Sequence, residues 1–303
     1  MIEEAFANTE IAVNDGVFVG PFRQPFNEHL DTKTSIHDDK TAQKAGMRGG
    51  TIAGSYHLEQ FVPLFIKAFG RRWFETGGIS IYFRYATMHL EPVQCFVRSP
   101  ETENNAQVDV WMNHKNGQLV AEGTASIGSP AEPSALRKRI NNLHPPGEVR
   151  ILKDLKPGTD VPSITVNIPM ENTQKRFERI TEPLDWYVKE SPWGGPILTP
   201  SQMIKALRHG VVVAFDQRGL RQGVVGLFGA LEFRYLNGPI FCDKDYVSTG
   251  RIIAVGETPK TEYYWLEGVL EEPDTGEKAA DSLIMIRVVK ATSPLYPELQ
   301  QDV

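Results

Sequence analysis

The chain contains few of the residues that define several common classes of protein. Its 303 residues include only two cysteines, Cys95 and Cys242. Two cysteines provide no disulfide framework and no thiolate metal site, so we expect a reducing, cytoplasmic compartment. No run approaches the roughly 18 apolar residues that a membrane-spanning helix requires. The first residues, Met1-Ile-Glu-Glu, are acidic where a signal peptide would be basic, so we expect no such peptide.

An excess of positive charge and the common nucleotide and metal motifs are also missing. The formal net charge is −6 and the pI is about 5.7, which argues against general nucleic-acid binding. The patterns Gly-x-Gly-x-x-Gly, Walker A and Gly-x-Ser-x-Gly are absent, and none of the seven histidines forms a His-x-x-x-His pair. We therefore expect no nucleotide-binding loop of these types, no serine hydrolase site and no bound metal.

The first half of the chain shows helix and strand patterns in a clear order. Short strand pieces are expected in 10–22 and a short helix in 39–45. Residues 55–69 have apolar side chains at helical spacing, with a kink expected at Pro63. Strand-like alternation follows in 78–98, and residues 106–127 predict a hairpin around Lys115-Asn-Gly117.

The second half repeats this order. Gly49-Gly-Thr-Ile-Ala-Gly-Ser55 recurs as Gly194-Gly-Pro-Ile-Leu-Thr-Pro200, and Ile81-Tyr-Phe-Arg-Tyr85 recurs as Leu231-Glu-Phe-Arg-Tyr235. A helix is expected at 200–213, where Thr199-Pro-Ser-Gln202 has the pattern of a capping box. A second hairpin turn is expected at Asp274-Thr-Gly276.

The repeat predicts an α+β protein made of two units, each a curved antiparallel sheet wrapped around one long helix. The expected boundaries are 1–130 for the first unit and 163–303 for the second. Residues 131–162 form the expected linker, with a short helix at 134–142. The two units would pair, edge to edge, as a pseudo-dimer in one chain.

This arrangement resembles the tandem form of the hotdog fold, and within it the MaoC-like hydratases and dehydratases of acyl-CoA thioesters. In that family a loop carries Asp-x-Asn-Pro-(aliphatic)-His, followed by an acid, an alanine, a glycine and the hotdog helix. The positions that match here are Ile36-His37, Asp39, Ala42 and, one residue early, Gly46. Thr32 occupies the position of the family's catalytic Asp, and Thr34 and Ser35 occupy those of its Asn and Pro.

Hydration of an enoyl thioester needs a base, an acid and N–H donors for the enolate-like oxygen. His37 is the first candidate, and the alternative is a loop histidine bonded to the backbone. Asp31 is the candidate second partner, or else an ordinary turn residue. Glu59 would supply a carboxylate from the long helix, unless it is a solvated helix residue. Asp39 would orient the histidine, or else cap the short helix together with Asp38.

Candidate substrate-binding residues lie at the start of the long helix and in the second half. The resemblance implies that N–H groups at Gly54 and Ser55 face the thioester carbonyl, although Gly54 would also serve as a plain N-cap. His57 either contacts substrate or packs at the edge of the core. Trp193, with Trp186 and Tyr187, either lines an acyl pocket or packs between the two units.

The function implied is a hydratase or dehydratase acting on an acyl thioester by His–carboxylate acid–base catalysis. A hotdog thioesterase, in which Glu59 or Asp39 activates water, and a non-catalytic acyl-thioester binding protein are the alternatives. CoA or a carrier protein would be part of the substrate, and no other cofactor is expected. We expect no nucleic-acid or membrane partner, and either a monomer with its internal pseudo-dimer or a homodimer.

Overall fold

The computed structural model describes residues 10–30, 32, 35–143, 147–217 and 224–299. The first half contains these elements: β1 (Ala12–Asn14), β2 (Val17–Val19), α2 (Asp39–Lys44), α3 (Tyr56–Gln60), α4 (Val62–Phe69), η1 (Gly70–Arg72), α5 (Trp73–Thr76), β3 (Gly77–Phe83), β4 (Val93–Arg98), β5 (Gln107–His114) and β6 (Leu119–Ile127). The rest of the described chain contains these: α6 (Ala135–Ile140), β7 (Asp160–Asn167), α7 (Met170–Phe177), η2 (Asp185–Tyr187), α8 (Pro200–Leu207), α9 (His209–Gln217), β8 (Gly226–Tyr235), β9 (Asp245–Glu257), β10 (Thr261–Glu271), β11 (Lys278–Val289), η3 (Lys290–Thr292) and η4 (Pro297–Leu299).

Within these described ranges the strands form one 11-stranded sheet in the order β1-β2-β4-β5-β6-β3-β8-β11-β10-β9-β7. The two halves meet where β3 and β8 pair antiparallel, from Gly78 opposite Arg234 to Tyr82 opposite Ala230. Outward from this seam the strand order in one half mirrors that in the other. The edge-to-edge joining expected from the repeat is therefore present.

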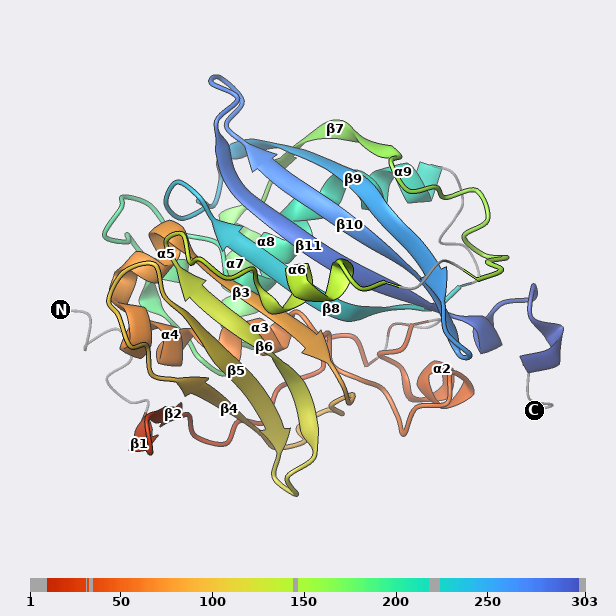
Figure 1. Ribbon diagram of the computed structural model, residues 1–303, viewed down its shortest axis with the longest axis horizontal. Coiled ribbons are helices and arrows are strands. Elements are labelled where there is room, and N and C mark those ends of the chain that lie inside the picture. The colour runs from red at the N-terminus through yellow and green to blue at the C-terminus, as the bar shows by residue number, and fades with distance from the viewer. Residues whose placement is uncertain (1–9, 31, 33–34, 144–146, 218–223, 300–303) are drawn as a thin grey trace.

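Helices α3 and α4 lie behind the first half of the sheet in Figure 1, and α8 lies behind the second half. Helices and sheet bury a large apolar cluster with residues from both halves, in which Phe61, Phe65, Trp73 and Phe233 are fully buried. Each such side chain contributes on the order of 2 kcal/mol by leaving water. Among the described helices none has the length and apolar character needed to cross a membrane.

Both long helices of the prediction are interrupted. The expected helix at 55–69 is divided between α3 and α4 at Phe61. Pro63 lies in the first turn of α4, where its missing N–H leaves no helical bond unmade. The expected helix at 200–213 is divided between α8 and α9 at Arg208. The capping box at Thr199 is confirmed in both directions.

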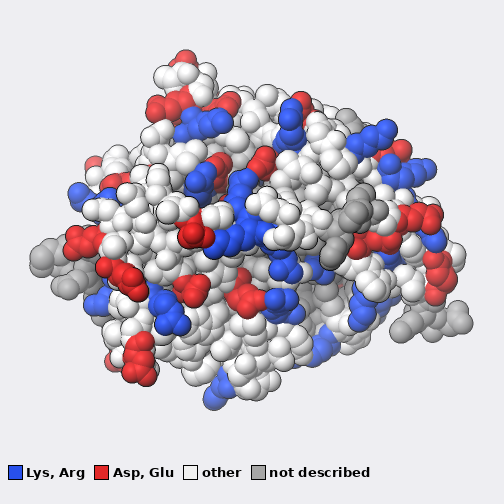
Figure 2. All heavy atoms as spheres, viewed as in Figure 1, with Lys and Arg blue, Asp and Glu red and all other residues white. Residues whose placement is uncertain are grey.

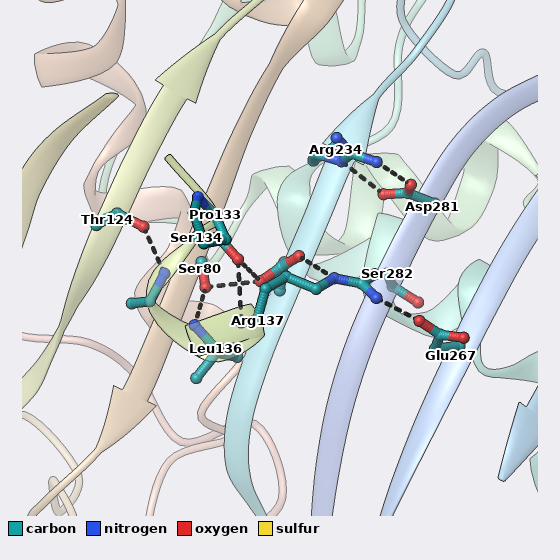
Figure 3. A network of polar contacts seen from close by, with 12 residues as sticks. Ser80, Thr124, Pro133, Ser134, Leu136, Arg137, Arg234, Glu267, Asp281 and Ser282 are labelled. Carbon is teal, nitrogen blue, oxygen red and sulfur yellow. Dashed lines mark hydrogen bonds and ion pairs between the residues drawn. The ribbon is translucent and has the colours of Figure 1, made fainter. Parts of the chain in front are cut away.

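The expected linker, 131–162, contains α6 and the first residues of β7. Helix α6 lies on the outer face of the sheet, in front of the seam in Figure 1. A buried carboxylate, that of Glu232 on β8, fixes it there. This carboxylate accepts hydrogen bonds from Ser80 on β3 at 2.7 Å, from Ser134 at 2.6 Å and from Arg137 at 3.2 Å. Figure 3 shows how this network joins α6 to strands of both halves. On the same outer face, acidic and basic side chains are interspersed (Figure 2).

Candidate active site

A cavity of about 640 Å³ lies between the two halves. The first half contributes residues of the loop 29–37 and the segment before α3, and the second half contributes α9 and the inner face of β8, β10 and β11. Polar groups gather on its first-half side, and mostly apolar side chains come from the second half. The residues that line the cavity include His29, Thr32, His37, Ala53, Gly54, Arg208, Val211, Val212, Phe215, Asp216, Phe228, Ile286 and Val288.

His37 lies at this cavity, half-buried, at the end of the loop. Its Nδ1 is 2.6 Å from the carbonyl oxygen of Thr51. A carbonyl oxygen only accepts, so Nδ1 carries the proton and the neutral ring keeps its lone pair on Nε2. Burial lowers the pKa of His37, the bond to Thr51 opposes this effect, and the nearby His29 adds to it. The ring is therefore held neutral, with one nitrogen able to accept a proton.

The backbone around His37 is fixed by Asp39 and the glycine turn. The Asp39 carboxylate accepts a hydrogen bond from the N–H of Gly50 at 2.7 Å. A Cβ atom at Gly50 would lie 2.3 Å from the carbonyl oxygen of His37, so only glycine fits there. Asp38 is the N-cap of α2 and accepts from the N–H of Thr41 at 3.0 Å. Asp39 thus holds the main chain beside His37 and makes no contact with its ring.

Gly54 lines the cavity directly before α3. A Cβ atom here would lie 3.0 Å from two carbons of the Phe83 ring, so the position is crowded on the side facing the sheet. In the part of the chain that the structure describes, the N–H groups of Gly54 and Ser55 have no protein acceptor. Ser55 is buried next to the cavity wall and is the N-cap residue of α3, without a side-chain capping bond.

The structure places Glu59 in a different environment, between the helices of the two halves. Its fully buried carboxylate accepts from Nε of Arg176 at 3.0 and 3.2 Å and from the hydroxyl of Ser201. Arg176 lies on α7 and Ser201 on α8, so the ion pair joins elements of both halves. Glu59 is not part of the cavity wall, and its position is explained by this contact.

His57 and Trp193 also lie away from the cavity. The His57 ring is buried, with Nδ1 2.8 Å from Oε1 of Gln60. Burial is the main cause that lowers its pKa to about 4, so the ring is neutral. The Trp193 indole donates to Glu75 at 3.0 Å and packs against the ring of Phe74 on α5. Both residues follow the packing alternative stated for them.

Asp31, the expected carboxylate partner of His37, lies outside the described residues. The structure brings other polar groups to His37 that the sequence did not single out. His29 is 5.2 Å from His37 between ring centroids, and Arg208 and Asp216 line the cavity from the second half. The family motif directs attention to the residue five positions before His37, and His29 is eight positions before it.

No group of three or more His, Cys, Asp or Glu side chains that could hold a metal is found among the described residues. The groups at this wall that can transfer protons or form hydrogen bonds are histidine, hydroxyl, backbone N–H and the charged Arg208 and Asp216, beside apolar side chains. Such an arrangement suits a carbonyl compound with an apolar chain.

Comparison with known proteins identifies the fold. No protein-family model and no curated protein matches the sequence. A protein from Chloroflexus aurantiacus J-10-fl, named as a MaoC domain dehydratase, aligns over 93% of this chain and 94% of its own, at a TM-score of 0.58 and 12% identity. A Mycobacterium tuberculosis protein described as having a double hotdog fold aligns over 91% of this chain and 97% of its own, at 0.55 and 13%. The protein therefore has the α+β double hotdog fold to which MaoC-like dehydratases also belong.

Proposed function

We propose that the protein is a hydratase or dehydratase of acyl thioesters, with His37 as its general base. One observation carries this proposal: a neutral histidine, with Nδ1 hydrogen-bonded to the Thr51 carbonyl, lies at the wall of a cavity that combines polar groups with an apolar surface from α9 and the sheet. A proton-accepting nitrogen next to a binding chamber is the arrangement that water activation requires. The similarity in fold to a protein named as a MaoC domain dehydratase supports the same class of reaction.

In the hydration direction, Nε2 of His37 accepts a proton from water while the water oxygen bonds to the β-carbon of an enoyl thioester. The electron pair of the double bond moves toward the thioester carbonyl, whose oxygen becomes enolate-like. The N–H groups of Gly54 and Ser55, which have no acceptor among the described residues, are suited to stabilise that oxygen. Protonation of the α-carbon completes the addition, and the reverse sequence is dehydration.

The apolar part of the cavity fits the acyl chain. Val211, Val212 and Phe215 on α9 face Phe228 and Ile286 of the sheet across this space. A volume of about 640 Å³ lies within the range of pockets for small organic ligands. The first half would thus supply the reacting groups, and the second half the chamber for the chain.

The thioesterase alternative, in which Glu59 or Asp39 activates water, has weaker support, because both carboxylates are engaged elsewhere. Glu59 is occupied by Arg176 and Ser201, and Asp39 by the N–H of Gly50. Neither carboxylate lines the cavity. A non-catalytic acyl-binding protein would use the same cavity, and only an activity measurement separates it from an enzyme.

The test follows the loss of enoyl-thioester absorbance with crotonyl-CoA and longer enoyl-CoA substrates, with a thiol reagent in a parallel well. Wild type is compared with His37→Ala and with His209→Ala, a control residue at the start of α9 that does not line the cavity. We expect absorbance loss without thiol release, at least about 100-fold slower in His37→Ala and unchanged in His209→Ala. Equal rates in wild type and His37→Ala would contradict the proposal. Thiol release would indicate a thioesterase instead.

A further inference from the structure

A second histidine shares the polar wall of the cavity. His29 lines the same chamber as His37, and their ring centroids are 5.2 Å apart with the planes inclined by 44°. Unlike His37, it has an exposed side chain, so it can exchange protons with solvent. Thr32 also lines this wall, but a hydroxyl group does not supply a proton near neutral pH.

The two histidines are held by one buried side chain. Oδ1 of Asn27 accepts from the backbone N–H of His29 at 3.0 Å, while its Nδ2 donates to the carbonyl oxygen of His37 at 2.9 Å. Asn27 is 1% exposed, and its own N–H donates to Nδ1 of His89 at 3.1 Å. The spacing between His29 and His37 is therefore set by the fold, although the two residues belong to a loop.

A phenol and a carboxylate lie behind His29. The Tyr56 hydroxyl donates its single proton to Oε2 of Glu28 at 2.9 Å and lies 3.4 Å from Nε2 of His29. Since that proton is used, Nε2 of His29 is the donor toward the phenol oxygen, which leaves Nδ1 as the nitrogen that gains and loses a proton. Burial is the main cause that raises the pKa of Tyr56, and the charge of Glu28 adds to it, so the phenol stays protonated.

We infer that His29 is the second catalytic residue of the site and the acid that protonates the α-carbon. The inference rests on the proposed function. In hydration, Nδ1–H of the His29 imidazolium gives its proton to the α-carbon while Nε2 of His37 takes one from water. A C–O bond, a C–H bond and the N–H bond on Nε2 of His37 form, while the C=C π bond, one O–H bond of water and the Nδ1–H bond of His29 break, and the water molecule is consumed. The proton on His37 returns to His29 through solvent, which restores the starting state.

The surrounding charges agree with His29 as the acid and His37 as the base. Among the described residues, the titratable and charged groups near His29 are His37 on the loop, Tyr56 on α3 and Glu28 behind the phenol, and Arg208 and Asp216 line the same cavity from the second half. Arg176 of α7 lies over the Tyr56 ring with its guanidinium carbon 3.6 Å from the centroid, and it is paired with Glu28 and Glu59. A cation at His29 disfavours a second one at His37, whose pKa is lowered mainly by burial and further by His29.

The test measures kcat/KM for hydration of crotonyl-CoA as a function of pH in wild type, His29→Gln, His37→Ala and the control His209→Gln. In wild type the rate falls at low pH as His37 gains a proton and falls at high pH as His29 loses one. We expect His29→Gln to be at least about 100-fold slower at the optimum and to lose the high-pH decline. His209→Gln keeps the wild-type profile.

Substitution of a residue with a merely structural role would lower kcat/KM at every pH without removing the decline at high pH. Retention of more than half the rate by His29→Gln, while His37→Ala is inactive, overturns the role of His29 and leaves the proposed function standing. Equal rates in wild type and His37→Ala overturn the proposed function itself. Tyr56 is a positioning residue, since its phenol oxygen lies 3.4 Å from Nε2 of His29. Tyr56→Phe should lower kcat by less than His29→Gln does and should keep both limbs of the pH profile.

Discussion

Replacement of Arg176 by methionine should destabilise the protein strongly, because it leaves a buried charge without its partner. The side chain of Glu59 is 0% exposed and that of Arg176 is 9% exposed. The variant keeps an unbranched apolar side chain but removes the guanidinium bound to both oxygens of Glu59. Breaking a buried ion pair from one side costs about 3–5 kcal/mol. That is a large share of a typical unfolding free energy of about 5–15 kcal/mol.

The assay is urea unfolding followed by tryptophan fluorescence, with the free energy of unfolding taken from the transition. The double variant Arg176→Met, Glu59→Gln should recover at least half of the loss, since the fully buried charge is gone and Glu28, the other partner of Arg176, is partly exposed. Lys175→Met is the matched control on α7, because Lys175 pairs with Glu171 on the surface, and it should have no measurable effect. The reasoning is refuted if Arg176→Met unfolds at the same urea concentration as Lys175→Met.

Three further predictions concern single residues. The pKa of His57 is about 4 in the folded protein against 6.5 when unfolded. Between these values the unfolded chain binds the extra proton, so the free energy of unfolding should fall by up to about 3 kcal/mol from pH 6.5 to pH 4. In His57→Gln the urea midpoint should depend less on pH across that range. Gly50→Ala places a methyl group against the carbonyl oxygen of His37 and should lower kcat at least tenfold in the hydration assay while leaving far-UV circular dichroism unchanged. Val211→Phe places a larger side chain in the apolar part of the cavity. If it excludes two methylene groups of the acyl chain, at about 0.8 kcal/mol each, the preference for long over short acyl chains should fall roughly 15-fold in kcat/KM. An unchanged preference would mean that the acyl chain binds elsewhere.

Local sequence signals predicted most of the fold correctly. Asn116-Gly117 forms the turn between β5 and β6, where Gly117 has a φ of +86° that favours glycine. The Thr199 capping box and the helices α2 and α6 were predicted for similar reasons, since each depends on residues a few positions apart. These signals are readable because their partners are close in the sequence.

The environment of the candidate site residues depends on partners that are distant in the sequence. Glu59 is separated from Arg176 by 117 residues, so its buried ion pair was not predictable from helical spacing. His29 is close to His37 in space because Asn27 bonds to the backbone of both, and loops have no periodicity that would reveal such a contact. The family motif identified His37 and gave no indication of His29.

The seam between β3 and β8 has a consequence for any attempt to divide the chain. Along this edge the backbone N–H and C=O groups of each strand are hydrogen-bonded to the other strand, from Gly78 opposite Arg234 to Tyr82 opposite Ala230. An isolated half would present this strand as an open edge, with unpaired N–H and C=O groups ready to join another chain. It would also expose Glu232 or Ser80, whose polar atoms now meet under α6. Duplication within one chain thus protects a sheet edge that a single unit could cover only by self-association.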